Sequence, residues 1–448
     1  MTSPTTAPNG EPVIPTAPYP PVKRGKDGRF TVLGISGRRL AAVLVGWFFV
    51  VFDGYDLIVY GTVQTSLAHE WGLDNTALGA IGSTAFLGMV IGAVIVGRLS
   101  DSLGRKTAVI GSVLVLSIFT LLCAVAPNPW VFAAFRLIAG IGLGGLVPSV
   151  NAMTSDLVPR NKIAAWSTVM MSGVPIGGSI AAVAAQWIVP SHEEGWRIMF
   201  LLAFIPLVVG LPIALKVIPS SKAIEADYEA REGHDEPAGF KDLLVGRYRD
   251  VSIWFAIATF VTLLAWYGLG TWLPRLMETA GYNLGAALMF TLALNLGAVL
   301  GSVTTAWAGD RFGTLRTGVV AAGVAGVALL ILLMHPPVWM VYLILIAAGV
   351  GTHGTQILII AAVANFYPHN LRGTALGWAL GVGRLGAVVA PQAAGLLLSM
   401  GLGVGSNYIM FGGAAILSAL ALFILNLKEL KFAQVNVKED TKQPVAVS

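Results

Sequence analysis

Apolar residues run along this chain in stretches of about 20, each long enough to cross the ~30 Å hydrocarbon layer of a membrane as an α-helix. Short polar connections separate them. The stretches begin near residues 40, 77, 106, 130, 163, 197, 251, 285, 317, 338, 372 and 407. The pattern predicts an all-α polytopic membrane protein with twelve transmembrane helices.

The composition agrees with a membrane protein. Hydrophobic residues make up 56% and charged residues 11% of the 448 positions, and a soluble protein carries about twice that charge. The single cysteine, Cys123, excludes a disulfide framework. The chain has no phosphate-binding loop, no His or Cys cluster at metal spacing and no nucleophile motif. We therefore predict no enzyme activity, no cofactor and no metal site.

Lysine and arginine gather on one side of the predicted bundle. Twelve spans place both termini on the same side, and 24 of the 28 Lys and Arg residues fall there. They are Lys23, Arg24, Lys26, Arg29, Arg38, Arg39, Arg98, Arg105, Lys106, Arg160, Lys162, Lys216, Lys222, Arg231, Lys241, Arg247, Arg249, Arg311, Arg316, Arg372, Lys428, Lys431, Lys438 and Lys442. Since cytoplasmic connections are enriched in basic residues, we predict a plasma-membrane protein with cytoplasmic termini. The net charge of +5 then reflects loops that face anionic lipid rather than nucleic acid.

One spacing, 209 residues, repeats between the two parts of the chain. It joins Asp101 to Asp310, Gly104 to Gly313, Gly140 to Gly349, Gly142 to Gly351, Gly145 to Gly354, Pro159 to Pro368, and the pair Gly61 and Thr62 to Gly270 and Thr271. The spacing predicts two parallel six-helix halves with a substrate site between them near mid-membrane. We expect a cytoplasmic tail over 1–39, the first half over 40–218, a cytoplasmic linker over 219–250, the second half over 251–427 and a second tail over 428–448.

Two motifs resemble those of the major facilitator superfamily. The segment from Gly97 to Lys106 is similar to the superfamily's loop signature Gly-x-Leu-x-Asp-x-x-Gly-Arg-Lys. Arg136 and the glycines that follow it resemble the fourth-helix motif. The resemblance covers residues of about 40 to 430 and implies the major facilitator fold. It also implies gating loops, formed by Gly97, Asp101, Gly104, Arg105, Lys106, Trp307, Asp310, Arg311 and Gly313. The second loop departs from the signature, with Thr314 and Leu315 where Arg and Lys would stand.

Two shorter clusters resemble one family within that superfamily. Asp53, Gly54, Tyr55 and Asp56 are similar to the Asp-Gly-aromatic-Asp motif of the aromatic acid:proton symporters. The glycine-rich run around Arg384 in the eleventh span looks like the same family. The resemblance implies a proton-coupled symporter that imports benzoate, hydroxybenzoate, gentisate or protocatechuate by alternating access. We expect it to work as a monomer.

Asp53 and Asp56 lie three residues apart on one face of the first helix, deep in the span. Burying an ionised group in hydrocarbon costs at least ~2.5 to 3.5 kcal/mol, so a purely structural pair of acids is expensive. A carboxyl group that exchanges a proton in the membrane is what proton coupling requires. The alternative is that one Asp pairs with an arginine to hold helices together. The sequence leaves open which Asp carries the proton.

Arg384 and Arg136 are candidates to bind the substrate carboxylate. The helical rise of ~1.5 Å per residue places both near the level of the two acids. The planar guanidinium fork matches a carboxylate. Arg384 is the first choice because it comes from the half without buried acids and lies among glycines. Arg136 has a competing interpretation as a partner of the first-helix acids.

Other polar and aromatic residues are candidates to bind the ring: Tyr55, Trp266, Tyr267, His353, Gln356 and Trp378. Aromatic residues in membrane helices more often face lipid or pack against neighbours. Trp266 and Tyr267 are adjacent, so at most one points straight at the substrate. His353 and Gln356 share a helix face and could bind a ring hydroxyl, or could bond helix to helix; His353 could also join the proton path.

Other functions remain open on the sequence alone. A superfamily carrier of sugars, drugs, dicarboxylates or a nicotinate-like acid would share the loop signature. A receptor or scaffold that does not transport could use the same fold, although buried charges at one depth argue against it.

Overall fold

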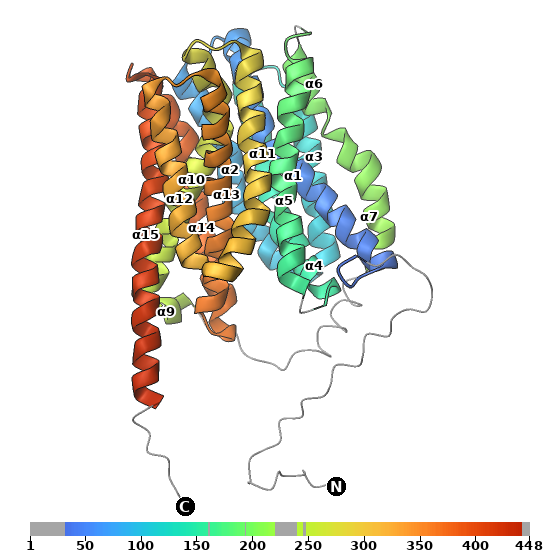
Figure 1. Cartoon of the computed structure of the whole chain (residues 1–448). Coiled ribbons are helices and arrows are strands. Elements are labelled where there is room, and N and C mark those ends of the chain that lie inside the picture. The colour runs from blue at the N-terminus through green and yellow to red at the C-terminus, as the bar shows by residue number, and fades with distance from the viewer. Residues whose placement is uncertain (1–31, 160–161, 193, 220–239, 245–247, 441–448) are drawn as a thin grey trace, which may run out of the picture.

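The computed structural model is a bundle of long α-helices that stand side by side (Figure 1). The structure describes residues 32–159, 162–192, 194–219, 240–244 and 248–440, and it leaves undescribed the side chains of some helical residues, Asp101 among them. The helices are α1 Gly37–Trp71, α2 Asn75–Leu103, α3 Arg105–Cys123, α4 Pro129–Leu157, α5 Ile163–Ile188, α6 Gly195–Leu201, α7 Leu211–Val217, α9 Phe240–Leu243, α10 Arg249–Thr279, α11 Leu284–Phe312, α12 Thr314–Ile331, α13 Val338–Phe366, α14 His369–Ser399 and α15 Gly403–Asp440.

In the described part of the chain, 12 spans are long and apolar enough to cross a membrane. This confirms the predicted number, and each span begins within a few residues of its predicted start. The sixth span differs from the prediction in being broken. Its two helices, α6 and α7, are joined through a π-helical turn at Pro206–Gly210. Pro206 lacks the N–H that a continuous helix needs, which explains a break at this point.

The internal repeat is visible in matching local structure. Asp74 caps α2 by accepting a hydrogen bond from Ala77 N at 2.7 Å, and Asn283 caps α11 through Ala286 N at 2.8 Å. These two caps lie 209 residues apart. Gly104 and Gly313, at the same offset, both have positive φ, at 84° and 94°. Such a backbone favours glycine and makes the tight turn between consecutive helices.

Helix packing repeats in the same way. A Cβ added at Gly88 would lie 2.0 Å from the carbonyl oxygen of Leu137, so α2 and α4 touch through their backbones. At the equivalent positions of the second half, a Cβ added at Gly297 would lie 2.3 Å from the carbonyl oxygen of Ile346, so α11 and α13 touch in the same way. Small residues allow this close approach between membrane helices. The two halves therefore share one internal architecture.

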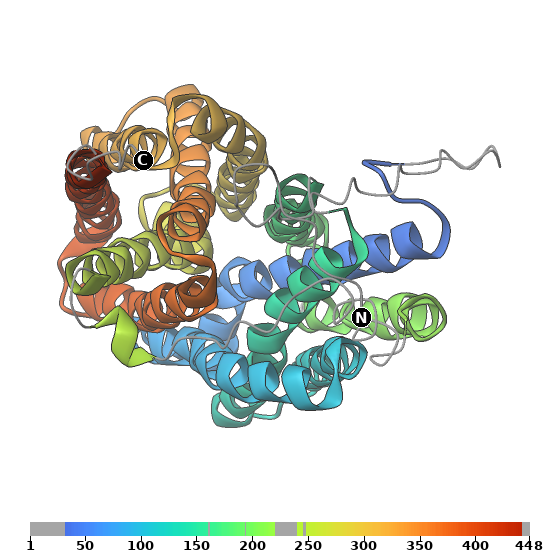
Figure 2. The ribbon, with the colours of Figure 1, turned by 90° about the horizontal axis from the view of Figure 1, so that it is seen from below.

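The halves form two groups of helices when the molecule is seen from below (Figure 2). α1 to α7 make one group and α10 to α15 the other. Most of the predicted linker and the first tail lie outside the described residues, so the boundaries at 39, 218 and 250 stay predictions. α15 continues to Asp440, past residue 428, where the second tail was predicted to begin.

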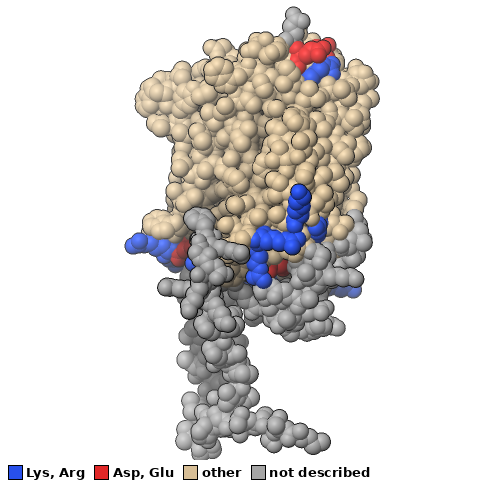
Figure 3. Space-filling view, turned by 90° about the vertical axis from the view of Figure 1, so that its right-hand side faces the viewer, with Lys and Arg blue, Asp and Glu red and all other residues tan. Residues whose placement is uncertain are grey.

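We call the end where α1 begins and α15 ends the terminal end of the bundle; it is the lower end in Figure 1. Charged side chains gather at this end in Figure 3, with one small group at the opposite end. The wall between them is almost free of charge on this face. A bilayer fits against such an apolar belt.

The halves meet toward the end opposite the terminal end. Thr76 donates a hydrogen bond to Ser399 Oγ at 2.7 Å, and the Ser83 hydroxyl donates to Val388 O at 2.7 Å. Farther along α14, toward the terminal end, an added Cβ at Gly381, Gly377 or Gly373 would meet nothing within 4 Å. These three glycines are exposed. α14 thus contacts the first half over its distal part and diverges from it toward the terminal end.

Candidate functional site

Asp56 and Arg136 form a buried ion pair within the first half. Arg136 Nη1 lies 2.6 Å from Asp56 Oδ2, and its Nη2 donates to the backbone oxygen of Asp56 at 3.3 Å. Thr120 on α3 donates to the other carboxylate oxygen, Oδ1, at 2.6 Å. Each of the three residues is no more than 2% exposed. Both oxygens of Asp56 are therefore satisfied, which is the condition for keeping an ionised group in hydrocarbon.

Asp53 lies one helical turn from this pair and is arranged differently. It is 1% exposed, and its Oδ1 has no hydrogen-bond partner in the described part of the chain. The charges of Asp56 and Arg384 act on it from nearby. Between the two acids, Gly54 packs on α5, where an added Cβ would lie 2.0 Å from Val174 O. In the sequence Asp-Gly-Tyr-Asp, the first acid thus has an oxygen without a hydrogen-bond partner, the glycine makes a helix contact, and the second acid has partners for both oxygens.

Arg384 comes from α14 in the second half and points across to the first. It is half-buried, and its Nη1 donates to the backbone oxygen of Met89 on α2 at 3.3 Å. This is the one hydrogen bond that the described residues give it. Asp53 and Tyr267 lie within electrostatic range of its guanidinium. The fork therefore keeps donors free for an anion, whereas that of Arg136 is committed to Asp56.

Among the candidate aromatic residues, Tyr267 lies within electrostatic range of both Asp53 and Arg384, whereas Tyr55 lies near Asp56. Its ring packs against Phe86 of α2, with 5.0 Å between centroids, so it sits at the junction of the halves. The neighbouring residue Trp266 points instead at His353, also at 5.0 Å. This agrees with the 100° that separates adjacent residues on a helix.

Tyr55 and Trp378 are held by backbone groups of their own halves. The Tyr55 hydroxyl donates to Met199 O at 2.7 Å on α6. The Trp378 indole N–H donates to Ser252 O at 3.0 Å, near the start of α10. Both therefore have structural roles in this structure. Their assignment to the ring stays a prediction from sequence.

The first gating loop contacts its own half through two basic residues. Arg105 donates to Ser100 Oγ at 2.9 Å and lies 3.7 Å from Asp156 at the end of α4. Lys106 donates to the carbonyl oxygens of Leu215 and Ile218, at 2.9 and 3.0 Å, and so caps the end of α7. Lysine at a helix C-terminus also complements the helix dipole. Asp101, the acid of this loop, lies outside the described side chains.

The second gating loop is arranged more openly. Asp310, Arg311 and Gly313 are exposed. Arg311 lies over the ring of Trp307, 5.8 Å from its centroid, and Trp307 is itself 59% exposed. An exposed cation–π contact of this kind is worth about 0.5–1 kcal/mol. Thr314 and Leu315, which replace the Arg and Lys of the first loop, cannot form the equivalent ion pair.

Sequence reasoning missed Thr120, Phe86 and Asp156. Thr120 and Phe86 stand in apolar spans, where a lone hydroxyl or phenyl ring is ordinary and gives no signal. Asp156 was detectable, because it is an acid near a span end on the same side as the loop cations.

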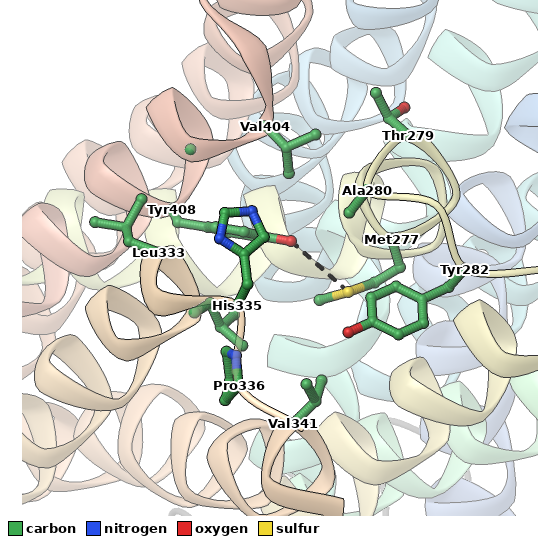
Figure 4. A pocket seen from close by; sticks show the side chains of 12 residues that line it. Met277, Thr279, Ala280, Tyr282, Leu333, His335, Pro336, Val341, Val404 and Tyr408 are labelled. Carbon is green, nitrogen blue, oxygen red and sulfur yellow. Dashed lines mark hydrogen bonds between the residues drawn. The ribbon is translucent and has the colours of Figure 1, made fainter. Parts of the chain in front are cut away.

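A separate cavity of about 350 Å³ opens within the second half, at the end opposite the terminal end (Figure 4). The end of α10, the connection after α12 and the starts of α13 and α15 surround it. Tyr408 reaches across it to Met277, whose sulfur accepts its hydroxyl at 3.7 Å (Figure 4). His335 and Tyr282 also line it. None of the predicted site residues does, so this cavity is distinct from the charged site.

Breaking the buried ion pair should destabilise the protein. Arg136→Ala leaves Asp56 as an unpaired buried charge, and removing one partner of such a pair costs about 3–5 kcal/mol. Thr120→Val removes one hydrogen bond to the same carboxylate, a smaller loss of about 1.5–3 kcal/mol. We expect a large fall in the unfolding temperature of the purified protein for Arg136→Ala and a smaller one for Thr120→Val. Equal unfolding temperatures for wild type and Arg136→Ala would contradict the structural role.

Comparison with known proteins agrees with this arrangement of helices. The family model described as Major Facilitator Superfamily matches residues 46–304 and 288–447. A gentisate transporter of Corynebacterium glutamicum is 80% identical over 396 residues, covering 88% of this chain and 89% of that one. A benzoate transport protein of Acinetobacter baylyi is 33% identical, with coverage of 86% and 89%.

This chain belongs to the aromatic acid transporters of the Major Facilitator Superfamily. Its fold matches the xylose transporter XylE from E. coli in a partially occluded inward open conformation, with a TM-score of 0.72, 17% identity and coverage of 87% of this chain and 98% of that one. The family match and the gentisate transporter make the protein a multi-pass membrane transporter and not an enzyme, as the sequence predicted.

Proposed function

We propose that this superfamily member imports small aromatic carboxylates of the gentisate and benzoate type together with protons, by alternating access. The names of its relatives support the substrate class. The observation that carries the proposal is the unequal pairing of four charges within the helix bundle. Asp56 and Arg136 neutralise each other, whereas Asp53 and Arg384 approach from opposite halves and retain free capacity for a proton and an anion.

The proton and the anion balance each other in this scheme. An unpaired carboxylate in a low-dielectric site is costly, so Asp53 is stable there when it is protonated or compensated by Arg384. An incoming carboxylate competes for the same guanidinium. Binding of the anion at Arg384 therefore favours a proton on Asp53, which couples the two ligands.

The contacts between the halves support alternating access. The halves are hydrogen-bonded toward the end opposite the terminal end and diverge toward the terminal end. This is expected of a carrier whose substrate site is open to one side of the membrane. With the basic residues at the terminal end, that end is cytoplasmic, and the structure is the inward-facing state. Both termini then lie in the cytoplasm. We propose that one chain works alone in the plasma membrane.

Uptake by cells that make the protein tests the proposal. We expect radiolabelled gentisate, hydroxybenzoates or benzoate to accumulate, with faster uptake at acidic external pH and loss of accumulation on adding a protonophore. Nicotinate and a dicarboxylate serve as competitors for the two other classes of anion that would satisfy the same charges. Accumulation that persists with the protonophore would exclude proton coupling, and competition by the dicarboxylate alone would exclude the aromatic class.

A further inference from the structure

His353 on α13 is a buried imidazole whose bonding capacity is unused. It is 1% exposed, and neither Nδ1 nor Nε2 has a hydrogen-bond partner among the described residues. The backbone of Met171 on α5 lies beside the ring without meeting hydrogen-bond geometry. Two unpaired buried polar atoms on one side chain are uncommon, because each loses its hydration on burial.

His353 lies at the interface between the halves, at the same depth as Arg384. Met171 belongs to the first half, so the ring lies at the interface between the halves, as Arg384 does. Counted from the terminal ends of α13 and α14, His353 and Arg384 both lie about 20 Å deep. α10 runs between the two positions, because Tyr267 lies near Arg384 while the preceding residue, Trp266, packs against His353.

The hydrogen-bonding capacity of a neutral imidazole restricts which ligand groups can bind to it. One ring nitrogen donates a hydrogen bond and the other accepts one. A phenolic hydroxyl can meet either nitrogen, since it both donates and accepts. A carboxylate can only accept, and the charged Arg384 is the better partner for it. The helix-to-helix bond considered from the sequence would have occupied at least one nitrogen, and the described residues show no such bond.

We propose that His353 binds a ring hydroxyl of the substrate and makes the carrier selective for hydroxylated aromatic acids over unsubstituted benzoate. The inference rests on the proposed function, with the carboxylate at Arg384. Gln356, one turn further along the same face of α13 and 7% exposed, is a second polar group for a ring substituent. A site built to bond a hydroxyl penalises a ligand that lacks it, because the protein group stays unpaired.

Competition binding to the purified full-length carrier tests the inference. In wild type we expect gentisate to bind about tenfold more tightly than benzoate. His353→Phe keeps a flat ring against Trp266 and removes both nitrogens. It should weaken gentisate binding until the two acids bind about equally, while benzoate affinity changes little. His353→Gln, which can still donate and accept, should restore part of the preference.

Two controls separate specificity from other roles. Thr355 on α13 has a buried hydroxyl with no hydrogen-bond partner among the described residues, and Thr355→Val should leave the preference for gentisate intact. The ratio of benzoate uptake at acidic to neutral external pH should be the same in His353→Phe and wild type, which excludes a proton-path role. An unchanged preference in His353→Phe, or equal losses for both acids, would overturn the inference. Failure of wild type to bind either acid would instead overturn the proposed function.

Discussion

Asp53→Asn should abolish proton-driven accumulation of substrate while leaving substrate binding in place. Asn is nearly isosteric with a protonated Asp and cannot release a proton, so the buried site is filled without a titratable group. For one proton per substrate, each unit of pH gradient supports up to about tenfold accumulation in wild type. In proteoliposomes with an imposed pH gradient, the variant should bring the internal substrate concentration no higher than the external one. It should still exchange labelled for unlabelled substrate.

Asp56→Asn is the matched comparison, three residues away on the same helix. It leaves Arg136 without its carboxylate, so we expect a lower unfolding temperature as well as lost transport. The contrast distinguishes a proton carrier from a structural acid. Full acid-stimulated accumulation by Asp53→Asn would show that Asp53 is not the carrier, whatever Asp56→Asn does.

Arg384→Ala should eliminate measurable binding of aromatic carboxylates. Removing charge-assisted hydrogen bonds to a buried carboxylate costs about 1.5–3 kcal/mol for each bond, so two bonds correspond to a loss of at least about a hundredfold. Arg384→Lys should also bind poorly, because an ammonium group does not reproduce the planar fork. Isothermal titration of the purified carrier with gentisate measures both affinities.

Arg275→Ala is the control for a general loss of positive charge. Arg275 lies near the distal end of α10, where its Nη1 is 3.5 Å from Thr65 Oγ1, so its removal should change affinity little. Wild-type affinity in purified Arg384→Ala would rule out this residue as the anchor and would return Arg136 to consideration.

The fold was predictable because the membrane imposes strong rules on sequence. Apolar stretches of a fixed length, basic residues on one side and a repeated offset gave the twelve spans and their two matching halves. The break in the sixth span was not predicted. Pro206 was visible, but a proline in a membrane helix is compatible with a kink as well as a break.

The site was less predictable, because it depends on which side chains face one another. The sequence predicted four charges at one depth. It left open whether Arg136 binds the substrate or pairs with an acid, and which of the two acids carries the proton. The geometry distinguishes them, since Thr120 and Arg136 together satisfy Asp56 alone. Side-chain direction on a helix that is buried all round cannot be read from hydrophobicity, which explains why Tyr55 and Tyr267 were equal candidates.

The internal repeat does not extend to the buried acids of α1. At 209 residues from Asp53 and Asp56 stand Thr262 and Ala265, so the second half holds no counterpart of either acid. In the proposed mechanism, the first half thus carries the acid that exchanges protons, and the second half carries the arginine that binds the substrate anion. Neither half alone contains both the unpaired acid and the arginine that can compensate its charge. If the proposed function holds, the proton gradient acts at the interface between two halves that share one architecture but differ in the charged groups they carry.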